Sequence, residues 1–156
     1  MTFKIKYPKF NAGFTLIEVL LAVTIAAIVG SIAYSSYSTS SAKTSRTEAR
    51  NELTEIAQEL QRCFTVYGRF DDPNNGCATW ERLEGNKSID TRTGLYEIRL
   101  QDDGNAANDA TTFELRATPK ANGKQVKDSE CQMFSLRNTG AFVATNASNQ
   151  DSPRCW

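Results

Sequence analysis

Gly13-Phe14-Thr15-Leu16-Ile17-Glu18-Val19-Leu20 is the stretch that decides the fold, because it opens an apolar run that continues to about Tyr34. From Phe14 to Tyr34 the chain has 21 residues, and Glu18 is the only charged one among them. At about 1.5 Å per residue, a helix of this length spans the roughly 30 Å hydrocarbon core of a bilayer. The run therefore predicts a helix that crosses a membrane once.

A short basic segment precedes the apolar run. It contains Lys4, Lys6 and Lys9, and no acidic residue occurs before Glu18. Lysine and arginine gather on the cytoplasmic side of membrane helices. We therefore expect the N-terminus to lie in the cytoplasm and the rest of the chain to lie across the membrane.

The small residues Ala12 and Gly13 stand before the apolar run and not after it. A secretory signal peptide has an apolar core of about 7–15 residues, with its cleavage site beyond that core. Cleavage after Gly13 would instead discard the basic leader and leave the helix as the new N-terminus. It would also free the α-amino group of Phe14, which would give the Glu18 carboxylate a partner in an apolar setting where an unpaired charge is costly.

The string GFTLIEVL (residues 13–20), with its basic leader, resembles the processing and N-methylation motif of type IV prepilins and type II secretion pseudopilins. The resemblance implies that a membrane-bound prepilin peptidase and methyltransferase cuts after Gly13 and methylates Phe14. It also implies that Glu18 docks the subunit into a filament by neutralising a neighbour's N-terminal amine. We expect three parts, namely a cleaved leader (1–13), a transmembrane and assembly helix (14–41), and a periplasmic or extracellular head domain (42–156).

The resemblance further implies two successive locations. The subunit would first lie in lipid as a single-pass protein of the bacterial inner membrane, with its leader in the cytoplasm and its C-terminus in the periplasm. The inner-membrane pilus assembly machinery would then pack its helix against those of other pilin subunits in an extracellular pilus. Residues 30–41 hold Gly30 and a run of serine and threonine, which are weak helix formers. We expect this part of the helix to loosen on assembly, unless it is a plain linker.

The composition of the chain argues against several functions. The full chain has 18 basic and 18 acidic residues, and loss of the three lysines in the leader leaves 15 and 18, a formal net charge of −3. This mild acidity argues against a general nucleic-acid binder. The chain has no histidine, so a Cys–His or Ser–His catalytic pair is impossible and the commonest metal ligand is missing. We expect a structural protein that is not an enzyme and holds no cofactor or metal.

Four cysteines in a small exported domain predict two disulfides. Three pairings are possible, and the order of the cysteines favours Cys63–Cys77 and Cys131–Cys155. Each would close a loop of about 15–25 residues and stabilise the fold by roughly 3 kcal/mol in the chain-entropy model. A metal site built from the four thiolates is the alternative, although the spacings contain no Cys-x-x-Cys pair.

A second helical pattern follows the apolar run. Apolar residues recur at 3.6-residue spacing, which predicts an amphipathic half of the helix packed on a sheet, and they are Ala49, Leu53, Ile56, Ala57, Leu60 and Phe64. Four glutamates form an acidic column about 100° round the same helix, and they are Glu48, Glu52, Glu55 and Glu59. Like charges at i,i+4 slightly destabilise an isolated helix. The column is therefore either a solvated face or a contact for basic residues of a neighbouring subunit.

The rest of the chain predicts a sheet. An irregular stretch, 68–94, contains a turn signal at 71–76 and the packing anchors Trp80 and Leu83. Four strand-like segments follow at 95–100, 112–118, 132–137 and 141–145, and a short hairpin turn at 138–140 joins the last two. No connection has the periodicity of a crossover helix, so we expect a four-stranded antiparallel sheet and an α+β fold.

The C-terminal part gives a second resemblance. Ala117-Thr118-Pro119, a polar loop, Asp128, Cys131, a hairpin at Gly140 and a final Cys155-Trp156 resemble the minor pilins of the PilE type. This resemblance implies a pilin fold with a disulfide-closed C-terminal loop, and a minor subunit of a type IV pilus used for motility, adhesion or DNA uptake. A type II secretion pseudopilin, and a tip-located adhesin or DNA-binding pilin, remain the alternatives.

Two polar loops carry weaker signals. Residues 102–109 gather Asp and Asn oxygens of the kind that calcium uses, but they lack the alternation of an EF-hand, so we expect a solvated loop. The loop from Pro119 to Asp128 carries Lys120, Lys124 and Lys127. This basic loop is either solvated or touches DNA or a neighbouring subunit, and no aromatic residue is interleaved for base stacking.

Overall fold

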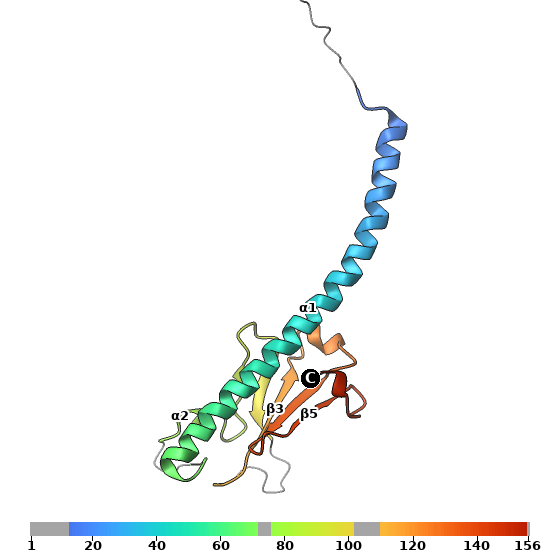
Figure 1. Ribbon diagram of the computed structural model, residues 1–156. Helices are drawn as coiled ribbons and strands as arrows, with labels where there is room; N and C mark the ends of the chain where they lie inside the picture. Colours follow the sequence, from blue (N-terminus) through green and yellow to red (C-terminus); the bar gives the residue numbers. More distant parts are fainter. Residues whose placement is uncertain (1–12, 72–75, 102–109, 156) are drawn as a thin grey trace, which may run out of the picture. The chain divides into compact units, whose positions relative to one another are not determined.

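The computed structural model describes residues 13–71, 76–101 and 110–155. The chain divides into two compact units, Met1–Thr39 and Ser40–Trp156. The leader lysines, most of the turn signal at 71–76 and the calcium-type loop at 102–109 lie outside the described residues. The elements in chain order are α1 (Leu16–Tyr67), α2 (Ala78–Glu81), β1 (Ile89–Asp90), β2 (Tyr96–Leu100), β3 (Glu114–Pro119), the 3-10 helix η1 (Lys124–Lys127), β4 (Met133–Arg137), β5 (Phe142–Thr145) and the 3-10 helix η2 (Pro153–Cys155) (Figure 1).

In the first unit, the described residues are helical from Leu16 onward, and their large apolar side chains are exposed. The side chains of Leu16, Ile17 and Ile32 are 79%, 72% and 68% exposed. By length and composition, α1 is a candidate membrane span. A helix with apolar side chains on all sides is suited to lipid or to packing against other apolar helices, because exposure of these side chains to water is unfavourable.

α1 continues without a break through residues 30–41. Hydroxyl groups along it bond to carbonyl oxygens about one turn earlier: Ser31 Oγ donates to Ile28 O over 2.8 Å, and Thr44 Oγ1 donates to Ser40 O over 3.1 Å. These bonds satisfy the hydroxyls without ending the helix. Residues 30–41 are thus helical in the subunit and not a plain linker, whereas their loosening on assembly stays a prediction.

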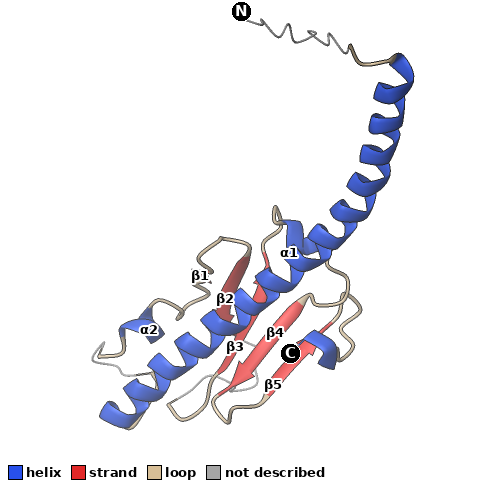
Figure 2. Ribbon diagram, turned by 45° about the horizontal axis from the view of Figure 1, so that its top comes forward, coloured by secondary structure: helices blue, strands red, loops and turns tan. Residues whose placement is uncertain are grey.

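The second unit contains an antiparallel sheet in which the strands follow the order β1-β2-β3-β4-β5 (Figure 2). The four expected strands are present as β2 to β5. The expected number of strands was wrong by one, because Ile89 and Asp90 of β1 pair with Ile98 and Glu97 of β2. Two residues are too few to show an alternating pattern, so periodicity does not reveal such a strand.

The amphipathic half of α1 packs across one face of this sheet (Figure 2). The expected apolar stripe is buried, with Phe64 partly buried at its end. It meets the inward-facing residues of the strands, and the buried members of both sides are Ala49, Leu53, Ile56, Ala57, Leu60, Tyr96, Ile98, Leu115, Ala117, Phe134 and Leu136. Burial of this apolar surface is the main force that holds the helix on the sheet.

Two disulfides close loops in the second unit. Cys63 near the end of α1 is bonded to Cys77, and Cys131 is bonded to Cys155 in η2, with Cα–Cα distances of 5.6 Å and 5.8 Å. These are the pairs that the order of the cysteines favours. All four thiols are in disulfides, which excludes the thiolate metal site.

Candidate functional site

The residues of the processing motif lie at the start of α1. Gly13 and Phe14 precede the helix and are exposed, and Glu18 lies in its first turn, where its backbone N–H donates to Thr15 O over 3.1 Å. Cleavage after Gly13, methylation of Phe14 and docking through Glu18 therefore stay predictions. The exposure of Phe14, which is 83%, is compatible with access by a processing enzyme.

A second candidate feature lies in the irregular stretch. We call the part of the chain between Cys77 and Leu95 the excursion. The single helical turn of α2 begins right after Cys77, and Trp80 and Leu83 are buried, as expected of packing anchors. At the tip of the excursion, Gly85 and Asn86 both have positive φ, at 68° and 65°. Gly and Asn are the residues that tolerate this left-handed conformation, so they allow the chain to reverse and enter β1.

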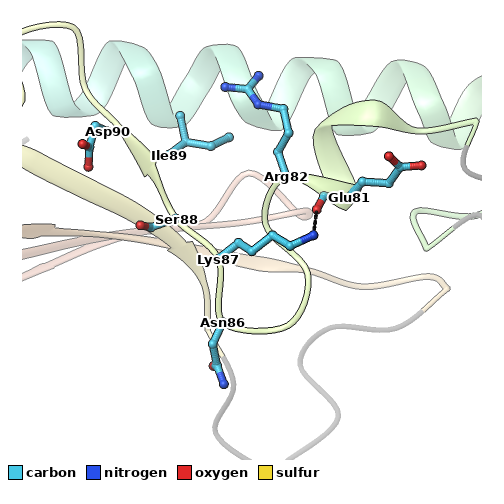
Figure 3. Close-up of a pocket in the computed structure, with 7 residues that line it drawn as sticks. All are labelled: Glu81, Arg82, Asn86, Lys87, Ser88, Ile89 and Asp90. Carbon is cyan, nitrogen blue, oxygen red and sulfur yellow. Dashed lines mark hydrogen bonds between the residues drawn. The ribbon is translucent and has the colours of Figure 1, made fainter.

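The excursion forms an open hollow of about 800 Å³ (Figure 3). Lys87 reaches across it and donates to the backbone oxygen of Glu81 over 2.9 Å. From β2, Arg99 Nη1 donates to Asn86 O over 2.9 Å and holds the tip. The hollow is lined by Glu81, Arg82, Asn86, Lys87, Ser88, Ile89 and Asp90.

The basic loop, residues 119–128, meets this excursion. Lys120 Nζ lies 2.7 Å from Asp90 Oδ2, and Lys120 N donates to Leu95 O over 3.0 Å. Gly123 packs so closely that an added Cβ would lie 3.0 Å from Lys120 O and 3.4 Å from Leu95 O. Only glycine allows this approach without displacement of the backbone. Gly123 is therefore the residue that lets the basic loop pack against Leu95 at the end of the excursion.

The side chain of Gln132 also holds the backbone of the basic loop. The amide nitrogen of Gln132 donates to the backbone oxygens of Gln125, Val126 and Asp128, over 3.3, 2.9 and 2.6 Å. Gln125 itself is buried, whereas Lys124 and Lys127 on either side of it are exposed. The loop therefore presents its two lysines outward from a fixed backbone.

An ion pair connects the end of the basic loop to α1. Arg46 donates through Nε and Nη2 to the two carboxylate oxygens of Asp128, over 2.7 Å each. The hydrogen bond to Asp128 raises the pKa of Arg46 above its ordinary value, although partial burial opposes the shift. Burial also raises the pKa of the Tyr96 phenol, whose hydroxyl faces Gln125 at 3.5 Å.

The acidic column of α1 is not an open face. Glu48 accepts hydrogen bonds from the backbone N–H and the hydroxyl of Thr93, over 2.7 and 2.8 Å. Glu52 accepts from the backbone N–H of Arg92 over 3.3 Å, and Glu59 accepts from the hydroxyl of Thr79 over 2.6 Å. Of the two alternatives for the acidic column, a simply solvated face does not hold for these three carboxylates, because the excursion of the same chain contacts them.

We define the basic surface as the cations of the excursion and of the basic loop, and they are Arg82, Lys87, Arg92, Lys120, Lys124 and Lys127. The two segments that carry them are joined at the Asp90–Lys120 ion pair. Lysine and arginine are the side chains that bind a phosphate backbone, and the excursion also carries the acidic residues Glu81, Glu84 and Asp90. Sequence reasoning singled out the three lysines of the loop but missed Arg82, Lys87 and Arg92, because an irregular stretch has no period from which to infer its position.

Comparisons with known proteins give two matches. A family model described as "Type IV minor pilin ComP, DNA uptake sequence receptor" matches residues 35–135, and a model of the prokaryotic N-terminal methylation motif matches residues 8–34. No curated protein matches the chain. The first match spans most of the second unit, including the excursion and the basic loop, and the second contains the whole processing motif.

Proposed function

Because the chain belongs to the family of type IV minor pilins described as ComP, a DNA uptake sequence receptor, we propose that it binds DNA at the surface of the pilus during DNA uptake. The family description supports a DNA ligand, and the basic surface supplies the chemistry to hold one. The observation that carries the proposal is the junction of the two basic segments at Asp90 and Lys120. A type II secretion pseudopilin would share the leader and the helix, but the match over residues 35–135 is to a minor pilin.

Before it can bind DNA, the subunit has to reach the filament. Prepilin peptidase cuts after Gly13 and methylates Phe14, with the leader in the cytoplasm and the head domain in the periplasm. The apolar half of α1 holds the subunit in the inner membrane until the assembly machinery packs it against other pilins. In the filament, Glu18 pairs with the N-terminal amine of a neighbour. The methylation-motif match over residues 8–34 supports this route.

The basic surface binds DNA through the phosphates. The mature chain is slightly acidic as a whole, so general charge does not attract DNA and local cations must do so. Asp90 is paired with Lys120, whereas the described residues give the guanidinium of Arg82 no ion-pair partner. Each phosphate that is neutralised releases counterions, so the affinity falls steeply with salt.

The test is the binding of processed, full-length protein in a nonionic detergent to labelled, sheared genomic DNA of the host cell. Arg82→Gln/Lys87→Gln and Lys124→Gln/Lys127→Gln should each weaken binding and lower the slope of log K against log salt by about 0.9 for each phosphate that the variant no longer neutralises. Arg154→Gln is the matched control, because Arg154 is exposed on η2 beside β5, at the edge of the sheet opposite to β1. Unchanged affinity in both double variants would reject the basic surface as the DNA-binding surface.

A further inference from the structure

We infer that Glu48, Glu52 and Glu59 are positioning residues, which hold the excursion in the conformation that carries the hollow and Arg92. The functional consequence of this inference rests on the proposed DNA binding, but the contacts themselves do not. The three carboxylates belong to one helix, and their partners belong to one segment, 79–93. Three of the four carboxylates of the acidic column thus form an internal clamp, whereas contact of the column with a neighbouring subunit stays a prediction.

The spacing of the three glutamates matches the spacing of their partners. Glu48 and Glu52 lie one turn apart on α1 and hold Thr93 and Arg92 at the end of the excursion. Glu59 lies about two turns further along the helix and holds Thr79 near the start of the excursion. The clamp therefore fixes both ends of the segment whose middle forms the hollow.

The clamp couples the helix to the excursion. In an isolated helix, the like charges at i,i+4 repel one another. In the folded subunit, three of the four carboxylates receive hydrogen bonds from the excursion, and bonds to an ionised acceptor are about twice as strong as neutral ones. Loss of these bonds would leave the repulsion in place without compensation.

The excursion has other attachments, among them the Asp90–Lys120 ion pair and the bond from Lys120 N to Leu95 O, but among the described residues none of these involves Arg92 or Thr93. The Cys63–Cys77 disulfide fastens only its start, and β1 adds two residue pairs with β2. Between β1 and β2 the chain turns at residues 91–95, where Thr91 N donates to Tyr96 O over 3.0 Å and Gly94 N donates to Thr91 O over 2.7 Å. The carboxylates of Glu48 and Glu52 hold the outer part of this turn against α1, and the side chain of Arg92 is exposed from it.

Simple electrostatics and positioning predict opposite results for the removal of a carboxylate. Loss of a negative charge near a DNA-binding surface should strengthen DNA binding if charge alone matters. Loss of a positioning residue should weaken it, because Arg92 and the hollow lose their fixed geometry. The sign of the change therefore separates the two explanations.

The experiment compares Glu48→Leu with Glu55→Leu in the processed, full-length protein in detergent. Glu55 is the matched control, because it lies on the same acidic column, is exposed, and has no hydrogen bond or ion pair among the described residues. Glu48→Gln tests rescue, since its amide oxygen can still accept the N–H of Thr93. Two quantities are measured in every variant, the hydrogen-exchange rate of the Arg92 and Thr93 amides without DNA, and the affinity for labelled genomic DNA.

We expect Glu48→Leu to raise the exchange rate of the Thr93 amide by about tenfold or more and to weaken DNA binding several-fold. Glu48→Gln should restore most of the slow amide exchange and most of the DNA affinity. Glu55→Leu should leave the exchange rate unchanged and the DNA affinity equal or tighter. Unchanged exchange in Glu48→Leu would overturn the clamp, and raised exchange with equal or tighter DNA binding would overturn its role in binding. If Arg82→Gln/Lys87→Gln and Lys124→Gln/Lys127→Gln keep full affinity, the DNA proposal fails, while the exchange rates still decide the clamp.

Discussion

Arg46 and Asp128 form a two-bond ion pair between positions 82 residues apart in the sequence. Both side chains are largely shielded, with exposed fractions of 15% and 8%. The same Asp128 carboxylate accepts from the backbone N–H groups of Glu130 and Cys131, over 3.2 and 3.4 Å. One carboxylate thus fixes the end of the basic loop to α1 and to the start of the disulfide-closed C-terminal region.

Asp128→Asn should lower the free energy of unfolding by about 1–3 kcal/mol, because it leaves a partly buried guanidinium without its main partner. Urea unfolding of the processed protein in detergent measures the change. Glu130→Gln is the control, since the Glu130 side chain is 63% exposed and lies 3.4 Å from Arg46. Its substitution should cost less than about 1 kcal/mol. Equal losses of unfolding free energy for both variants would contradict the role of Asp128 as the main partner of Arg46.

The phenol of Tyr96 should make stability fall at high pH. Burial raises the pKa of Tyr96 above its ordinary value of 10.0, and the nearby Asp128 carboxylate acts in the same direction while Arg46 opposes it. The folded state therefore keeps the phenol neutral where the unfolded state already releases the proton. Above about pH 10, this group should reduce the free energy of unfolding by about 1.4 kcal/mol per pH unit until the phenol of the folded state also ionises.

Tyr96→Phe isolates that contribution. The variant keeps the buried ring, which packs against Phe134 at a centroid distance of 5.9 Å, but has no proton to release. The difference in unfolding free energy between Tyr96→Phe and the parent protein, measured from about pH 7 to pH 11, should be flat below pH 10 and grow above it. A difference that stays constant with pH would show that Tyr96 ionises equally in both states.

Removal of the Cys63–Cys77 disulfide by a double Ser substitution should destabilise the second unit by roughly 3 kcal/mol, as the loop-closure model gives for a loop of about 15 residues. The two cysteines are 14 positions apart. The loss should be accompanied by faster hydrogen exchange at Trp80 and Leu83, because the bond fastens the start of the excursion. Cys131→Ser/Cys155→Ser should destabilise by a similar amount and leave exchange in the excursion unchanged.

Glu18→Ala should leave the protein processed and in the membrane but should strongly reduce its incorporation into pili. The physical reason is that the liberated amine of Phe14 in a neighbouring subunit would enter the apolar filament core without a counter-charge. Mass spectrometry of the N-terminus and the copy number in purified pili measure the two effects. Normal incorporation of the processed variant would refute the pairing.

Much of the second unit could be predicted from the sequence, because its elements carry periodic signals. The stripe from Ala49 to Leu60 predicts the buried face of α1, and the alternation in 95–100 and 112–118 predicts β2 and β3. The two-residue β1 and the single turn of α2 carry no period. Trp80 in α2 and Leu83 just beyond it are buried by contacts that only the completed fold provides.

The contacts of the candidate site could not be predicted, because each joins residues far apart in the sequence. The hydroxyl of Thr93 meets Glu48 across 45 positions, and Lys120 meets Asp90 across 30. Both glutamate and lysine read as solvated residues when their partners are unknown. The like-charge spacing of the acidic column is consistent with a solvated face or with a contact, and it does not indicate which segment makes the contact.

The short strand β1 also affects whether strands of neighbouring subunits can pair edge to edge. It covers Glu97 and Ile98 at the outer edge of β2, and Arg99 beyond it is tied to Asn86 O and carries a charge there. At the far side of the sheet, Asp151 bridges to Thr145, and Ser152 N donates to Ala144 O. Backbone groups along part of the edge of β2 and at the end of β5 are therefore occupied, which disfavours edge-to-edge pairing between neighbouring head domains.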